Sequence, residues 1–122
     1  MEMAIVLPLL MMLTMGVIHY SWLFLKAQQI TNAARSGARV GIVNPSAITA
    51  SVDTLMTAAG MGASGYTVSS VLGTNSGDPV TVTVAISKEN VAMKVALINA
   101  PSLLPLPPNG LHASVTMAKE GP

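Results

Sequence analysis

The side chains that could carry out chemistry are few, and their spacing assembles no catalytic or metal site. The chain has no cysteine, two histidines and five acids among 122 residues. The lack of cysteine excludes a disulfide framework, a thiolate metal site and a cysteine nucleophile. His19 and His112 stand apart from any metal-ligand spacing, so we expect one to be packed and the other to lie on the surface. The acids form no acid–base pair, and serine, histidine and aspartate follow no recognisable catalytic order. The sequence therefore predicts a protein that is not an enzyme and that uses no cofactor or metal.

Two binding chemistries are disfavoured as well. The glycines of Gly60-Met61-Gly62 do not join a strand to a helix N-terminus, so they do not predict a phosphate-binding loop. The formal net charge is +1, whereas a nucleic-acid-binding protein presents a basic face. We therefore expect no nucleic-acid partner.

The amino-acid composition is more informative, because it points to a long apolar helix. Hydrophobic residues make up 51% of the chain and charged residues only 9%, against about 25% in ordinary soluble domains. Residues 3–25 contain no Asp, Glu, Lys or Arg. As a helix this run is about 35 Å long, enough to cross a hydrocarbon core of about 30 Å. It is too long for the apolar part of a secretory signal, so a membrane-anchoring helix is the simplest interpretation.

Several residues give this apolar helix features beyond those of a plain anchor. Glu2 lies at its start, where an unpaired carboxylate is costly in an apolar environment. Pro8 removes one backbone donor and predicts a local bend, and Gly16 weakens the helix midway. Trp22 and Lys26 form an aromatic and cationic border of the kind that anchors helices at a membrane interface.

The helical pattern continues beyond this border to Val43, giving a predicted helix of about 63 Å from Glu2. Its second half carries a stripe of small residues spaced by four, Ala33, Gly37 and Gly41. The stripe could admit another helix closely or pack on the protein's own domain. A neighbouring polar and basic face holds Gln28, Asn32, Arg35 and Arg39. A solvated surface is the ordinary interpretation of such a face.

The remaining residues predict a small domain. Asn44-Pro45-Ser46 is expected to break the first helix and to cap a second one, which ends at Gly60 and Gly62. Strands are predicted at residues 66–72, 79–87 and 111–119, the second with a strict alternation of apolar and small residues. Residues 91–100 could form a short helix, and the prolines of 101–108 forbid regular structure.

We therefore predict an α+β fold, in which a long N-terminal apolar helix precedes one helix packed on a short antiparallel sheet. Residues 1–43 are the predicted helical segment for a membrane or a filament core, and residues 44–122 the small globular domain. A chain this small cannot cover the apolar run with its own domain. Lipid or other copies of the chain must do so.

Three segments resemble the TadE-like pilins of the tight-adherence branch of type IV pilus systems. They are residues 2–10 (EMAIVLPLL), 29–39 (QITNAARSGAR) and 111–120 (LHASVTMAKE). The resemblance implies a type IV pilin-like fold and a precursor in the inner membrane. It further implies that a prepilin peptidase trims the precursor and that the pilus assembly machinery draws it into an extracellular filament. By position, Glu2 resembles the family's acid that neutralises a processed N-terminus, although the family places it at the fifth mature residue. Pro8 and Gly16 resemble helix-softening sites.

The sequence is thus interpreted as a structural subunit that polymerises with copies of itself into a bacterial surface filament for attachment. Glu2, Pro8, Gly16, Ala33, Gly37 and Gly41 are its predicted assembly residues. We expect Glu2 to be neutralised by an α-ammonium group, its own or a neighbour's. The alternatives are a minor pilin or pseudopilin of a pilus or secretion machine, and a single-pass membrane-anchored binding module.

Overall fold

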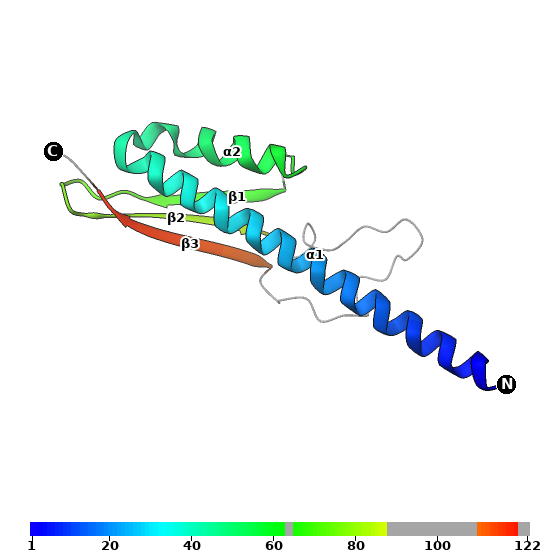
Figure 1. The fold of residues 1–122 in the computed structure, drawn as a ribbon. Helices are drawn as coiled ribbons and strands as arrows, with labels where there is room; N and C mark the ends of the chain where they lie inside the picture. The colour runs from blue at the N-terminus through cyan, green and yellow to red at the C-terminus, as the bar shows by residue number, and fades with distance from the viewer. Residues whose placement is uncertain (63–64, 88–109, 120–122) are drawn as a thin grey trace.

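The computed structural model describes residues 1–62, 65–87 and 110–119. Helix α1 (Glu2–Val43) is followed by a 3-10 turn η1 (Pro45–Ala47) and helix α2 (Ile48–Ala58), then by strands β1 (Tyr66–Val71), β2 (Pro79–Ile86) and β3 (Leu111–Ala118). Figure 1 shows both helices on one face of the sheet, with the N-terminal half of α1 projecting beyond the domain. This architecture confirms the predicted α+β fold. The short helix considered for 91–100 and the proline-rich segment 101–108 lie outside the described residues.

Helix α1 ends where the sequence predicts, at Asn44-Pro45. Asn44 is extended (φ −138°, ψ 94°), as a residue before proline prefers, and its N–H still donates to the Val40 carbonyl at 2.8 Å. The expected cap on the second helix is absent, however. Ala47, which has no polar side chain, occupies the N-cap position of α2, and the Ser46 hydroxyl donates to Asn44 Oδ1 at 2.6 Å.

Helix α2 ends in a complete Schellman motif. Gly60 adopts φ +79°, a left-handed conformation that costs glycine little. Its N–H donates to the Thr57 carbonyl, and the N–H of Met61 donates to the Met56 carbonyl, both at 3.0 Å. Met56 and Met61 are both buried in the core, which supplies the apolar contact that usually accompanies this motif. The predicted stop at Gly60 is confirmed.

The sheet is antiparallel, in the order β1-β2-β3. In its central strand, Val80, Val82, Val84 and Ile86 alternate with half-buried residues and are fully buried. The paired strand β3 directs Leu111, Ala113, Val115 and Met117 toward the same core, as its alternation predicts. The register places all these side chains on the face covered by the helices.

The core of the domain depends on both helices, whereas the sequence predicted a sheet packed on one. Helix α2 has 11 residues and contacts β1, while the second half of α1 contacts β2, β3 and α2. From α1, the core receives Ile30, Ala33, Ala34 and Ala38, each at most 1% exposed. An 11-residue helix is about 16 Å long and covers only part of a three-stranded sheet. The second half of α1 therefore belongs to the same core as the sheet.

A hydrogen bond between side chains ties α2 to the first strand. The Tyr66 hydroxyl donates to Asp53 Oδ1 at 2.5 Å, and Tyr66 itself is 8% exposed. Burial, together with the hydrogen bond to Asp53 and its negative charge, raises the pKa of Tyr66 from 10 to about 12. The folded state therefore retains the tyrosine proton more strongly than the unfolded state does.

This shift predicts a loss of stability at high pH. The contribution of Tyr66 to the free energy of unfolding is complete below about pH 10 and is lost as the pH rises from about 10 to 12. Chemical denaturation of the detergent-solubilised chain at pH 9 and pH 11.5 measures the loss. Tyr66→Phe is expected to cost about 1.5 kcal/mol at pH 9, because it removes a hydrogen bond to a carboxylate, and to reduce the pH dependence. Equal pH dependence in the two proteins would contradict this assignment.

Candidate functional site

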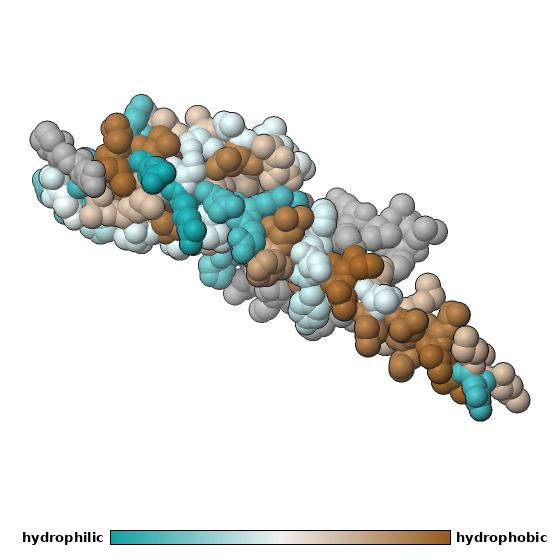
Figure 2. All heavy atoms as spheres, in the orientation of Figure 1, coloured by the Kyte–Doolittle hydropathy of each residue, from teal (hydrophilic) through white to brown (hydrophobic). Residues whose placement is uncertain are grey.

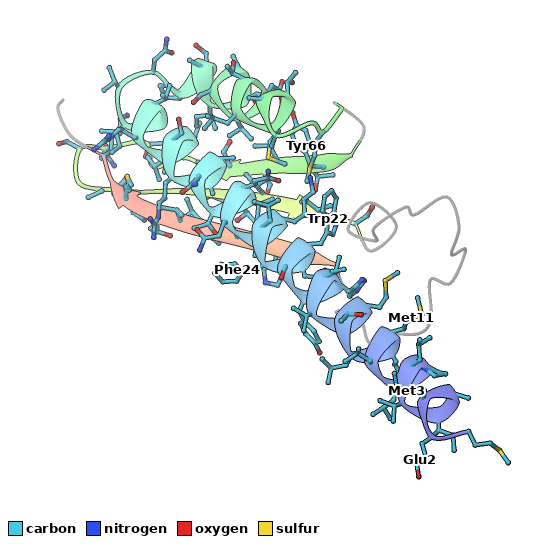
Figure 3. All side chains as sticks on the ribbon, turned by 45° about the vertical axis from the view of Figure 1, so that its right-hand side comes forward. Glu2, Met3, Met11, Trp22, Phe24 and Tyr66 are labelled. Carbon is cyan, nitrogen blue, oxygen red and sulfur yellow. The ribbon has the colours of Figure 1, made fainter. Side chains whose placement is uncertain are left out.

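The N-terminal half of α1 is an uncovered apolar surface. In the described structure its large hydrophobic side chains remain strongly exposed, for example Met3 at 78%, Ile5 at 77% and Met12 at 74%. Figure 2 shows this projecting half as a nearly continuous hydrophobic rod, and Figure 3 shows side chains leaving it on several sides. Exposure of this extent is typical of a surface that another molecule or a membrane covers.

Two hydroxyl side chains within this apolar half satisfy their donors locally. The Thr14 hydroxyl donates to the Met11 carbonyl at 2.9 Å, and the Ser21 hydroxyl donates to the Val17 carbonyl at 2.8 Å. A hydroxyl bonded back to its own helix loses little when it enters an apolar environment. These residues therefore do not prevent the helix from lying in lipid or against other helices.

Among the described residues, one helix is long and apolar enough by length and composition to cross a membrane. It is α1, and its most apolar window has a mean hydropathy of 1.9 with none of it buried inside the structure. A helix in the core of a soluble protein would be mostly covered by its own chain. Because none of this window is buried among the described residues, an apolar environment outside the subunit is a natural location for it.

Three of the predicted assembly residues lie on this projecting half. Glu2 is exposed in the first turn of α1, and Figure 3 places it at the tip farthest from the domain. A carboxylate at this position interacts favourably with the positive end of the helix dipole. Pro8 lies inside α1, and the helix continues on both sides of it. A Cβ added to Gly16 would meet nothing within 4 Å, so that side of the helix is open.

The border between the projecting half and the domain contains an interaction that the sequence analysis missed. Lys26 Nζ lies 4.7 Å from the centroid of the Trp22 ring, and Lys26 is only 6% exposed. This distance is typical of a cation–π contact. The signal was available in the sequence, since residues four apart are neighbours on a helix. Lys26 therefore serves the junction between helix and domain and is not a free surface cation.

The stripe of small residues faces the protein's own domain. Ala33, Gly37 and Gly41 are all buried. A Cβ on Gly37 would lie 2.8 Å from Val52 Cγ2, and one on Gly41 would lie 2.8 Å from Ile48 Cδ1. Of the two alternatives that the sequence left open, the structure contains the contact with the domain. Any effect of these residues on assembly would therefore pass through the fold of the subunit.

The predicted polar and basic face lies on the opposite, exposed side of α1. Its four residues, Gln28, Asn32, Arg35 and Arg39, are all exposed. In Figure 2, hydrophilic side chains gather over α1 where this helix crosses the domain. The projecting rod and this face are thus two chemically distinct surfaces of one continuous helix.

The histidines behave as packed and surface residues. His19 is half-buried on α1, and His112 is exposed on β3. His19 Nε2 and Gln29 Oε1 are buried without a hydrogen-bond partner, which the sequence gave no reason to expect. Within the described ranges, no three histidine, cysteine or acidic side chains group closely enough to hold a metal ion.

Comparison with known protein families finds one match, and it lies along α1. A family model described as TadE-like protein matches residues 1–39, which confirms the resemblance found in this part of the sequence. No curated protein and no solved structure matches the chain. The matched segment contains the projecting apolar rod and all four residues of the exposed polar face. The match covers about a third of the chain and shows that this segment is similar to TadE-like proteins.

Proposed function

From its TadE-like N-terminal segment, we propose that the protein is a pilin-type subunit that polymerises through α1 into a surface filament used for attachment. The observation that carries the proposal is the exposed apolar half of α1, which continues as one helix into the folded domain. Copies arranged in parallel would bury these halves in a central bundle and display the domains outside. Before assembly, the same surface would be covered by the inner membrane.

The transfer from membrane to bundle is energetically reasonable. Lipid tails are as apolar as the side chains of α1, so burial alone gives little preference for the bundle. Packing between helices supplies the preference, and the projecting half offers methionine side chains that adapt to irregular neighbours. Met3, Met11 and Met12 are all strongly exposed there. At no stage does the apolar surface have to enter water.

The polar features of the projecting half support assembly better than plain anchoring. Glu2 lies at the apolar tip, where a simple anchor gains nothing from a carboxylate and a bundle can provide a cation for it. By family resemblance, the pilus assembly machinery and a prepilin peptidase act on the precursor. A minor pilin or pseudopilin would use the same surface, because it enters the same kind of helical array at its end.

Shearing of cells that express the full-length chain tests this proposal. We expect the chain to be released as long filaments that sediment without detergent and are visible by electron microscopy. A membrane-anchored binding module would remain in the membrane fraction and would require detergent for release. Recovery in membranes alone, with no fibres, would overturn the proposal in favour of the anchored module.

A further inference from the structure

The outer face of the sheet, which points away from both helices, is rich in hydroxyl groups. Where all three strands pair, their register places nine side chains on this face in three rows. They are Thr67, Ser69 and Val71 of β1, Thr81, Thr83 and Ala85 of β2, and His112, Ser114 and Thr116 of β3. Six of these nine are serine or threonine, and none is Asp, Glu, Lys or Arg. A partner of this hydroxyl face is therefore held by neutral hydrogen bonds and apolar contacts, and not by charge.

Hydrogen bonds between neighbouring strands hold several of these hydroxyls in place. The hydroxyl oxygens of Thr81 and Thr116 lie 2.9 Å apart, and the Thr83 hydroxyl donates to Ser114 Oγ at 3.1 Å. Each of these pairs uses one hydroxyl proton and leaves the second proton and further lone pairs for an external partner. Because the side chains are already restrained, they lose less conformational freedom when a partner binds.

The hydroxyl face has low relief and a regular spacing. Apart from His112 at one corner, none of its side chains is larger than valine or threonine. The six on the two edge strands are exposed, and the three on β2 are half-buried between them. Outward side chains recur about 4.8 Å apart across the strands and about 6.8 Å apart along them. A surface of this shape suits an extended polymer better than a small molecule, which needs a concave site.

The position of α1 determines where the hydroxyl face would lie in the proposed filament. Both helices cover the opposite face of the sheet (Figure 1), and the core is formed between these two layers. A bundle formed by the projecting halves of α1 therefore has the helical layer of each domain on its inner side. The hydroxyl face then points away from the bundle, toward whatever surrounds the filament.

We propose that the hydroxyl face binds neutral polysaccharide and is the attachment surface of the filament. This inference rests on the proposed function and names the class of its ligand. Sugar hydroxyls donate and accept hydrogen bonds as serine and threonine do, so neither partner has to desolvate a charge. The threonine methyl groups, Ala85 and the 70% exposed Val71 provide apolar contact for the C–H groups of sugar rings.

Binding by one subunit is expected to be weak. Hydrogen bonds between sugar and protein replace hydrogen bonds that both make with water, so each contributes little net free energy. A filament repeats the same face many times, and simultaneous binding of several copies to one polymer raises the overall affinity without any new contact. The measurement therefore requires a multivalent display of the full-length chain.

Co-sedimentation of filaments with cellulose, an insoluble neutral polysaccharide, tests the proposal. Thr81→Val with Thr83→Val removes two central hydroxyls and keeps the side-chain shape and the preference for strands. We expect normal filament yield and at least about a fivefold loss of the bound fraction. Thr81→Ser with Thr83→Ser keeps the hydroxyls and should bind within about twofold of the original. Thr54→Val with Thr57→Val, on the exposed side of α2, is the matched control that removes two hydroxyls elsewhere.

The outcomes separate the hydroxyl face from the proposed function. Filaments that do not bind cellulose, or that bind it equally well after the valine substitutions, would overturn the face as a polysaccharide site and leave the filament standing. Binding to vesicles of anionic phospholipid in place of cellulose would also overturn it. If the unaltered chain forms no filaments, the proposed function fails. Neutral phospholipid vesicles carrying many copies then give the same multivalent display, and their binding to cellulose, lost on valine substitution, would support the face alone.

Discussion

Removal of residues 1–25 is expected to give a detergent-free monomer that never forms fibres. The deleted segment contains the exposed apolar rod, while the contribution of α1 to the core begins with Ile30. Among the described residues, the last turns of this segment touch the domain through the partly buried Leu23 and through the contact of Trp22 with Lys26. The shortened protein therefore keeps nearly all of its core. Sedimentation velocity, circular dichroism and electron microscopy of this variant and of the full-length chain measure the outcome.

The stability of the shortened protein should be low. Its core is small for a free-standing domain, and chains of this size bury a limited share of their surface on folding. We expect partial unfolding near room temperature, while the secondary structure content still shows the sheet. Fibres formed by the shortened chain would contradict the central role of the apolar rod, since assembly would then depend on the domain.

Much of the fold was predictable because local physical signals agreed with the tertiary structure. The alternation from Val80 to Ile86 predicted a half-buried strand, and the structure buries each residue of that apolar series. Asn44-Pro45 predicted the end of α1, because the residue before proline avoids helical backbone. The failure of the expected cap at Ser46 has an equally local cause, since Ser46 lies inside the 3-10 turn and Ala47 takes the N-cap position of α2.

The role of α1 in the domain was harder to predict. A stripe of small residues allows close approach by any neighbour, and periodicity does not identify that neighbour. Only the structure shows that Ile48, Val52 and Val82 fill the space above Gly37 and Gly41. The partnerless atoms of His19 and Gln29 likewise depend on tertiary placement.

The candidate assembly site was predictable in its chemistry and less so in its geometry. The uncharged run and the acid at its start can be read directly from the sequence. The sequence alone did not show that the small residues are buried and the arginines exposed. This difference follows from the packing of α1 on the domain. The assembly roles of Glu2, Pro8 and Gly16 remain predictions.

Substitution of Gly37 by leucine is expected to unfold the domain. A single added Cβ already lies 2.8 Å from Val52 Cγ2 and 3.2 Å from Val82 Cγ1. Valine side chains have restricted rotation, so neither methyl group can move aside easily. Overpacking costs roughly 1–3 kcal/mol, and a whole leucine side chain at a helix–sheet contact belongs at or above the upper end of that range. Such a loss is a large share of the stability of a small domain. Limited proteolysis and thermal unfolding of the detergent-solubilised chain measure it.

Gly16→Leu is the matched control, because it adds the same side chain to the same helix where no atom lies within 4 Å of the new Cβ. Its domain should unfold at the original temperature, and the helix itself should gain up to about 1 kcal/mol because leucine favours helix over glycine. If filament yield falls in Gly16→Leu while the domain stays folded, the open side of Gly16 faces a neighbouring copy. If Gly37→Leu and Gly16→Leu unfold alike, α1 does not pack on the sheet as described, and the division of this helix into a buried half and a projecting half would be wrong.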